Sequence, residues 1–133
     1  MRLILDTNIL VSAFVFKSEN ANIVVRHAAK KHTLLFSEST FKELKSTLLK
    51  PKFAEFVELP TIRNFIINLI RIGEFIDPKI KIAECRDPKD NKFLELAVGG
   101  NADCIVTGDK DMIVLNPFRG IKIISPGDFL IQF

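Results

Sequence analysis

Four short, mostly apolar runs, each followed by polar or turn-forming residues, divide the chain and predict buried β-strands. They cover residues 2–5, 34–36, 104–106 and 121–124. Runs of this length are too short for a buried helix, and they are typical of strands that are covered on both faces of a sheet. Two weaker runs, at 75–76 and 80–82, indicate further brief strands.

Between these runs, apolar residues recur at helical spacing. Phe41, Leu44 and Leu48 form one such stripe, and residues 62–72 contain a broader one. The predicted helices follow Asp6, cover about 20–32, begin at 37–40, lie between Pro51 and Pro60, cover 62–72 and open at Asp87. Strands that alternate with helices assemble into a parallel sheet with helices on both faces. We therefore expect residues 1–133 to form a single α/β domain, a three-layer α/β/α fold with four to five mostly parallel strands.

The composition is that of a globular protein, with 47% hydrophobic and 26% charged residues. No apolar run approaches the roughly 20 residues that a membrane helix needs, and the two cysteines are too few for a disulfide framework. We therefore expect a cytoplasmic protein with reduced thiols and no export signal. The chain has 12 Phe but no Tyr or Trp, which favours recognition of a nucleic-acid backbone over stacking on bases.

Basic residues are concentrated in one segment, although the net charge of the whole chain is only +3. Residues 26–52 contain seven lysines and arginines and two glutamates, a net charge of +5. A basic surface of this kind attracts a polyanion, and the alternative is an ordinary solvated helix face. If the partner is RNA, we expect the basic side chains to contact its backbone, namely Lys42, Lys45 and Lys50.

Four carboxylates are expected to meet at one edge of the predicted sheet. Asp6 and Asp109 directly follow or lie close behind predicted strands, and Glu43 and Asp90 lie near the starts of predicted helices. In an open parallel sheet, ligands bind at the carboxyl ends of the strands, where these loops converge. Each acid also has a structural alternative: a helix cap for Asp6, a capping box with Thr40 for Glu43, complementing a helix dipole for Asp90, and a turn for Asp109.

The convergence of four carboxylates favours a metal site over these separate structural roles. Like charges at short range repel one another, and a hard divalent cation relieves that repulsion. Mg²⁺ or Mn²⁺ prefers oxygen ligands and can activate a bound water against a phosphodiester. The two histidines and two cysteines do not have the spacing of a zinc site.

Four motifs give the chain a resemblance to a known family. They are residues 5–8 (LDTN), 41–44 (FKEL), 87–97 (DPKDNKFLELA) and 102–111 (ADCIVTGDKD). In this order and spacing they resemble the PIN-domain ribonucleases, above all the VapC-like toxin components of toxin–antitoxin systems. The resemblance covers nearly the whole chain.

The resemblance implies a metal-dependent endoribonuclease that hydrolyses RNA and leaves 5′-phosphate and 3′-hydroxyl ends. Its metal-binding and catalytic acids would be Asp6, Glu43, Asp90 and Asp109, with Asp111 as a supplementary metal ligand. Asn8 and Thr107 would orient these carboxylates or a metal-bound water. The resemblance also implies Mg²⁺ or Mn²⁺ as cofactor and an antitoxin protein as partner. We further expect a homodimer formed through exposed apolar residues at about 9–16 and 62–72.

Two other classes of function remain open. Receiver and haloacid-dehalogenase-like domains also place an Asp after their first strand, but here the adjacent carboxylates of receivers are missing. Asn8 stands where a dehalogenase-like phosphatase needs its general acid. The second class is a non-catalytic PIN-like module that binds a partner through residues 62–72. The complete set of four acids argues against this class.

Overall fold

The first strand of the chain lies at the centre of the sheet. A computed structural model describes residues 1–133 and contains five strands in the order β3-β2-β1-β4-β5. All four neighbouring pairs are parallel, which confirms the predicted sheet. The strands are β1 (Arg2–Leu5), β2 (Thr33–Phe36), β3 (Glu74–Phe75), β4 (Cys104–Val106) and β5 (Lys122–Ile124).

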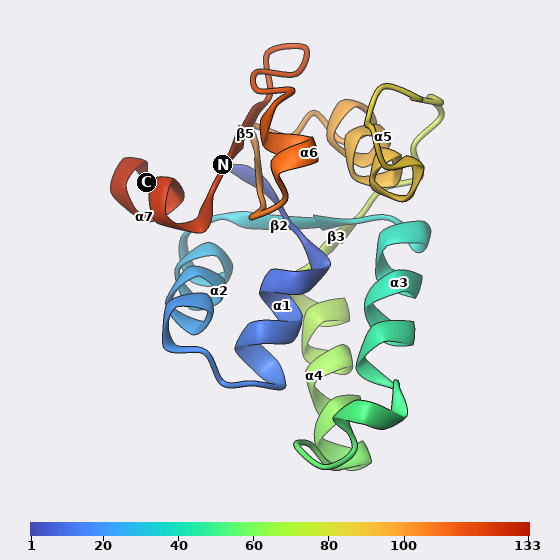
Figure 1. The fold of residues 1–133 in the computed structure, drawn as a ribbon, viewed down its shortest axis with the longest axis vertical. Helices are drawn as coiled ribbons and strands as arrows, with labels where there is room; N and C mark the ends of the chain where they lie inside the picture. Colours follow the sequence, from blue (N-terminus) through green and yellow to red (C-terminus); the bar gives the residue numbers. More distant parts are fainter.

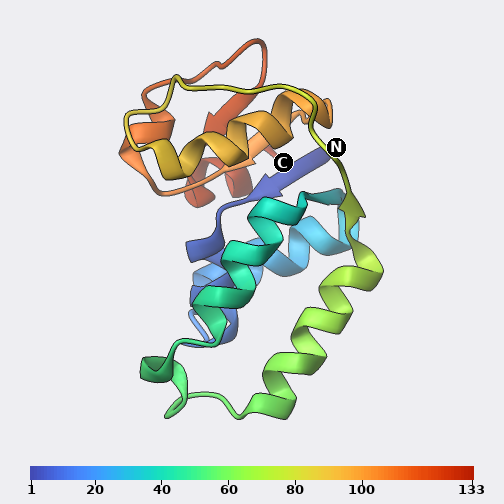
Figure 2. The same ribbon diagram turned by 90° about the vertical axis from the view of Figure 1, so that its right-hand side faces the viewer.

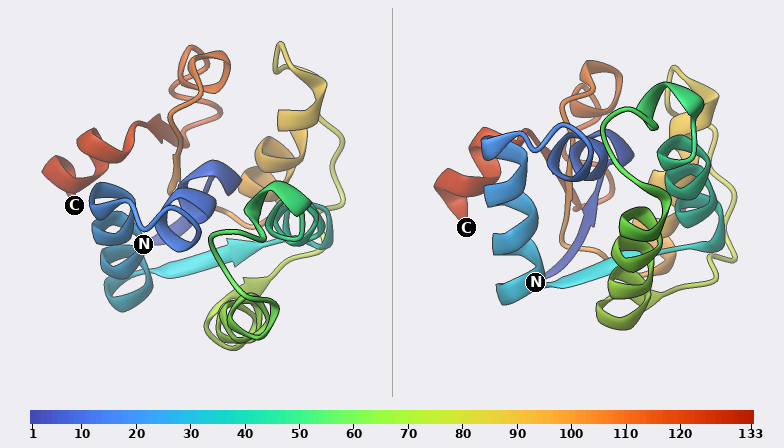
Figure 3. Two further views of the ribbon diagram at one scale, coloured as in Figure 1. Left: turned by 60° about the horizontal axis from the view of Figure 1, so that its bottom comes forward. Right: turned by 90° about the horizontal axis from the view of Figure 1, so that it is seen from below.

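Helices cover both faces of this sheet (Figure 1, Figure 2). The α-helices are α1 (Thr7–Phe14), α2 (Glu19–Lys31), α3 (Glu38–Leu48), α4 (Leu59–Ile72), α5 (Asn91–Gly99), α6 (Lys110–Ile113) and α7 (Pro126–Gln132). Two 3-10 helices, η1 (Pro51–Phe53) and η2 (Pro88–Asp90), precede α4 and α5. Figure 3 shows α1 between α2 and α3 on the face that points downward in Figure 1. None of the helices combines the length and apolar character needed to span a membrane.

The buried residues form two core clusters, one on each face of the sheet. Side chains alternate between the faces along a strand, so Leu3 and Leu5 of β1 belong to one cluster and Ile4 to the other. The first cluster packs the sheet against α1–α4 and α7, and the second packs it against α5 and α6. Burial on both faces explains why the strands are short continuous apolar runs. This arrangement is the expected three-layer α/β/α fold.

Two segments differ from the expectation. Residues 80–82 are not a strand: Ile82 packs into the core beside α5, and its backbone N–H donates to Glu95 Oε2 at 3.0 Å. The helix expected to open at Asp87 is interrupted, because Asp87 caps the short η2 and α5 begins only at Asn91. Two backbone N–H groups of this connection, those of Ile82 and Cys85, donate to the side chains of Glu95 and Asn91 on α5, in place of a strand partner.

The exposed apolar residues expected over 9–16 are mostly absent. Residues 9–11 and Val15 are buried in the first core cluster, and only Phe16, at 52% exposure, faces solvent to a large extent. The prediction was wrong here because α2 and α3 cover α1, so the apolar side chains of α1 pack against them inside the protein. On α4, by contrast, Ile67 is 60% exposed and Ile70 is 51% exposed.

Candidate active site

The centre of the candidate site is a hydrogen bond between the ends of two neighbouring strands. Leu5 of β1 pairs with Val106 of β4, so the next residues, Asp6 and Thr107, lie side by side. The Thr107 hydroxyl donates to Asp6 Oδ2 at 2.7 Å, and both residues are buried. Asp6 occupies the N-cap position of α1, but its side chain makes no capping hydrogen bond. Its strongest hydrogen bond is therefore to Thr107, and not to the helix that it precedes.

Thr107 also connects Asp6 to a second acid. Its hydroxyl oxygen accepts a hydrogen bond from the backbone N–H of Asp109 at 3.0 Å. One oxygen of the Asp109 carboxylate, Oδ1, accepts from the backbone N–H of Asp111 at 2.9 Å and caps α6. The hydroxyl thus bonds one carboxylate directly and the backbone of the other acid.

Asp90 approaches this pair from the other helical layer. It ends η2 just before α5, and its Oδ2 atom is buried without a hydrogen-bond partner. Burial raises the pKa of Asp90 to about 7, and a side-chain hydrogen bond that its protonated form can share with Asp109 adds to the rise, as do the charges of Asp109 and Asp6. Burial also raises the pKa of Asp6, while hydrogen bonds from the Thr107 hydroxyl and the Asn8 backbone lower it, and the charges of Glu43 and Asp109 raise it further. The acids are therefore close enough to oppose one another's ionisation.

Glu43 is held by two other helices. Its Oε1 atom lies 2.9 Å from the ammonium group of Lys92 on α5, and its Oε2 accepts a hydrogen bond from the Thr7 hydroxyl on α1. The alternative role of Glu43, in a capping box with Thr40, is excluded, because Ser37 is the N-cap of α3 and forms the box with Thr40. Glu43 therefore has no capping role, and it sits between the two helical layers of the fold.

The two remaining predicted residues lie at the edges of this group. Asp111 is an ion-pair partner of Arg86, with 3.7 Å between the charged groups. Asn8 is exposed and lines cavities on both sides of α1, and its role toward a metal-bound water remains a prediction. Sequence reasoning missed the contacts of Thr7 and Lys92 with Glu43, although both residues stand within the motifs.

The donor set fits a hard divalent cation. Asp6, Asp90 and Asp109 offer carboxylate oxygens, one of them buried and unpartnered, and such oxygens are the usual ligands of Mg²⁺ and Mn²⁺. In the arrangement described, no three acidic, histidine or cysteine side chains already form a group that could hold a metal ion. Binding would require the carboxylates to draw together, and Glu43 to exchange its contact with Lys92 for the ion.

The predicted basic residues follow α3 away from the acids. Lys42, Lys45 and Lys50 are all exposed. Lys42 lines a hollow together with Lys92, whereas Lys50 and Lys52 line a cavity of about 530 Å³ between α1 and the end of α3. The positive charge therefore extends from the neighbourhood of Glu43 toward η1.

Comparison with known proteins agrees with this arrangement. The sequence model of a PIN domain matches residues 2–111. The chain belongs to the PIN-domain family. PIN domains are typically nucleases and generally use divalent metal ions. Membership confirms the resemblance inferred from the four motifs, and it removes the receiver and dehalogenase-like alternative.

Two individual proteins are similar to this PIN domain over nearly its whole length. An uncharacterised protein of the archaeon Methanocaldococcus jannaschii is 27% identical over 146 aligned positions, which include 100% of this chain and 92% of that protein. A chain in the crystal structure of VapBC2 from Rickettsia felis, bound to a DNA fragment from its promoter, superposes with a TM-score of 0.63. It is 20% identical, and the alignment covers 94% of this chain and 98% of that one. The second likeness establishes the shared fold.

Proposed function

We propose that this PIN domain is an endoribonuclease that depends on Mg²⁺ or Mn²⁺ and hydrolyses RNA phosphodiester bonds. Its metal ligands and catalytic acids would be Asp6, Glu43, Asp90 and Asp109, with Asp111 supplementary. The observation that carries the proposal is the Asp90 carboxylate, whose buried Oδ2 atom has no hydrogen-bond donor and which lies beside the Asp6 and Asp109 carboxylates. A carboxylate in this position is costly in its charged form unless a cation or a shared proton neutralises it.

The protein's own groups would prepare the site for an attack by water. A bound divalent ion would supply a water of lowered pKa and offset negative charge on the phosphoryl oxygens. Thr107 orients Asp6 and the backbone of Asp109, while Thr7 and Lys92 hold Glu43 in place. Burial excludes water from the Asp90 oxygen, and this strengthens its interaction with a cation.

The proposed substrate path follows the positive surface of α3. Lys42 and Lys45 are exposed on the same helix as Glu43, and Lys50 is exposed just beyond its end, so a phosphate backbone bound there would lead toward the acids. Flexible ammonium groups on a helix surface contact phosphates without reading bases. We therefore assign them a role in affinity for RNA of any sequence.

We further propose that this cytoplasmic protein is the toxin component of a toxin–antitoxin system, with an antitoxin protein as partner. The likeness to a chain of the VapBC2 complex supports this assignment, together with the motifs described above. Homodimer formation through α4 is proposed as well, because Ile67 and Ile70, about one helical turn apart, are both more than half exposed.

The test is to sequence the RNA ends that appear after brief expression of the wild type and of Asp6→Asn. Glu84→Gln is the control for loss of an exposed carboxylate, because Glu84 pairs only with Arg119 in a surface ion pair and lies outside the hollows that contain Lys42, Lys45 and Lys50. We expect new 5′-phosphate ends with the wild type and the control, but not with Asp6→Asn. If the wild type produces no new ends yet binds a partner protein, the non-catalytic module is the better description.

A further inference from the structure

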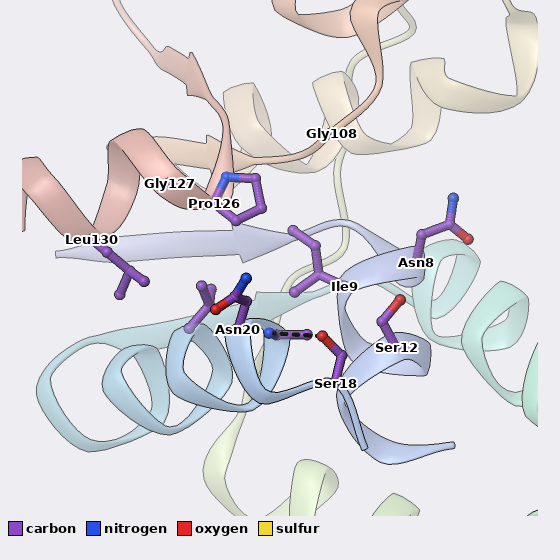
Figure 4. Close-up of a pocket in the computed structure, with 11 residues that line it drawn as sticks. Asn8, Ile9, Ser12, Ser18, Asn20, Gly108, Pro126, Gly127 and Leu130 are labelled. Carbon is purple, nitrogen blue, oxygen red and sulfur yellow. Dashed lines mark hydrogen bonds between the residues drawn. The ribbon is translucent and has the colours of Figure 1, made fainter. Parts of the chain in front are cut away.

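A cavity without charged residues opens beside the candidate active site. It has a volume of about 560 Å³ and lies between α1, α2 and the start of α7 (Figure 4). Asn8 and Gly108 are part of its lining, and these residues are sequence neighbours of Thr7 and of Thr107 and Asp109. The cavity therefore adjoins the edge of the sheet at which the acids converge.

The chemistry of the cavity contrasts with that of its surroundings. Apolar groups such as Ile9, Pro126 and Leu130 form part of its wall, and no Lys, Arg, Asp or Glu lines it. On the other side of α1, the cavity that contains Lys50 and Lys52 carries the positive charge. A phosphate group would find no counter-charge in the neutral cavity, whereas an uncharged group of the same ligand would avoid the cost of desolvating a charge.

The polar side chains of the cavity are free to bind a ligand. Figure 4 shows one hydrogen bond among the lining residues, from the backbone N–H of Ala21 to Ser18 Oγ. The amide of Asn20 and the hydroxyl of Ser12 make no hydrogen bond to the other lining residues, whereas the Asn8 amide points away from them. Amides both donate and accept, and they match the edges of nucleobases, whose flat faces fit apolar walls.

We propose that this cavity binds the nucleobase of a nucleotide adjacent to the scissile phosphodiester, and so determines where RNA is cut. The proposal rests on the proposed ribonuclease function, because the acids beside the cavity would act on the phosphate attached to that nucleotide. The backbone would then cross the start of α1, with phosphates toward the lysines and the base in the neutral cavity. Such a division separates affinity, which charge supplies, from selectivity, which the base contact supplies.

Two variants change the cavity without touching the proposed acids. Asn20→Ala removes one amide from an exposed helix position. Gly127→Leu places a side chain in the lining of the cavity and so narrows it. The backbone can accept this change, because a Cβ at Gly127 would meet only Ser125 Oγ, at 3.9 Å. Asn64→Ala is the matched control, an exposed asparagine on α4 outside the cavity.

The experiment combines cleavage-site mapping with direct binding. The RNA ends produced by each variant are sequenced, and binding of the four ribonucleoside 5′-monophosphates is followed by ligand-observed NMR. We expect the wild type to prefer one class of base, and Asn20→Ala to weaken its binding about three- to tenfold, the range for losing one neutral hydrogen bond. Both cavity variants should relax the base preference at the cut, while Asn64→Ala leaves it unchanged.

The outcomes separate the inference from the proposed function. If all variants cut RNA at the wild-type sites with wild-type preference, the cavity assignment is overturned and the ribonuclease stands. If the wild type does not cut RNA but binds one base in a manner sensitive to Gly127→Leu, the ribonuclease proposal fails and the nucleobase assignment stands. Binding that depends on the phosphate alone, with no difference among bases, also overturns the assignment.

Discussion

Replacing Asp90 with Asn should stabilise the metal-free protein at neutral and alkaline pH. The pKa of Asp90 is raised from 3.8 to about 7, first by burial and then by Asp109 and Asp6. Between these two values the folded state retains a proton that the unfolded state has released. The free energy of unfolding therefore falls as the pH rises from about 4 to about 7, and it stays low above that range.

The size of the effect follows from the pKa difference. Moving from 3.8 to about 7 corresponds to about 4 kcal/mol, at about 1.4 kcal/mol per pH unit. Asp90 is partly exposed and its charge is partly screened by solvent, so we expect about half of this, roughly 2 kcal/mol. Asn has nearly the same shape and no charge, so Asp90→Asn should gain this amount at pH 8 and little at pH 4. For a domain of this size, 2 kcal/mol raises Tm by about 8 °C.

The assay is thermal unfolding in EDTA between pH 4 and pH 8, followed by circular dichroism because the chain has no Trp or Tyr. Asp77→Asn is the control for loss of an exposed carboxylate. Added Mn²⁺ should raise the Tm of the wild type in proportion to the logarithm of its concentration, and the rise should be smaller in Asp90→Asn. The reasoning is refuted if Asp90→Asn is no more stable than the wild type at pH 8, or if it keeps the full response to Mn²⁺.

Three further predictions concern activity and assembly. Asp6→Asn and Asp109→Asn should each lower RNA cleavage at least about 10²-fold while the circular dichroism spectrum stays unchanged. Glu43→Gln should lower cleavage as well. Full activity in any of these variants would show that the replaced residue is not catalytic. Replacing Lys42, Lys45 and Lys50 by Ser should weaken binding to RNAs of different sequence and flatten the salt dependence of that binding. An unchanged salt dependence would show that RNA binds elsewhere. Light scattering at tens of micromolar should show a dimer for the wild type and a monomer for Ile67→Lys, and a monomeric wild type would contradict the α4 interface.

The ends of the central strands could be predicted from the sequence because local pattern and topology agree there. Asp6 follows one short apolar run, and Thr107, Gly108 and Asp109 follow another. Because the strands are parallel, both acids lie at the same edge of the sheet. Each inference needed only the length of a run and a general rule about parallel sheets. Glu43 and Asp90 were placed at the same edge because each lies near the start of a predicted helix.

Contacts between distant segments could not be predicted in this way. Lys92 reaches Glu43 because α3 and α5, on opposite faces of the sheet, approach each other beyond its edge. The start of α3 was placed only to within residues 37–40 because the segment SEST offers several capping residues, and only the backbone shows that Ser37 is the cap. Residues 80–82 alternate like a strand, but the alternation arises from Ile82 packing beside α5.

The division of the interior into two core clusters has a consequence for the acids above it. Glu43 moves with the layer of α3, and Asp90 moves with the layer of α5, while Asp6 and Asp109 are tied to the strands between them. The spacing of the carboxylates is thus set by how tightly each layer is clamped onto the sheet. If heat or a small cavity in one core loosens either layer, the distances between the carboxylates should change while most of the chain remains folded. A temperature-sensitive enzyme could then arise from a substitution that touches no ligand, with activity fading several degrees before melting.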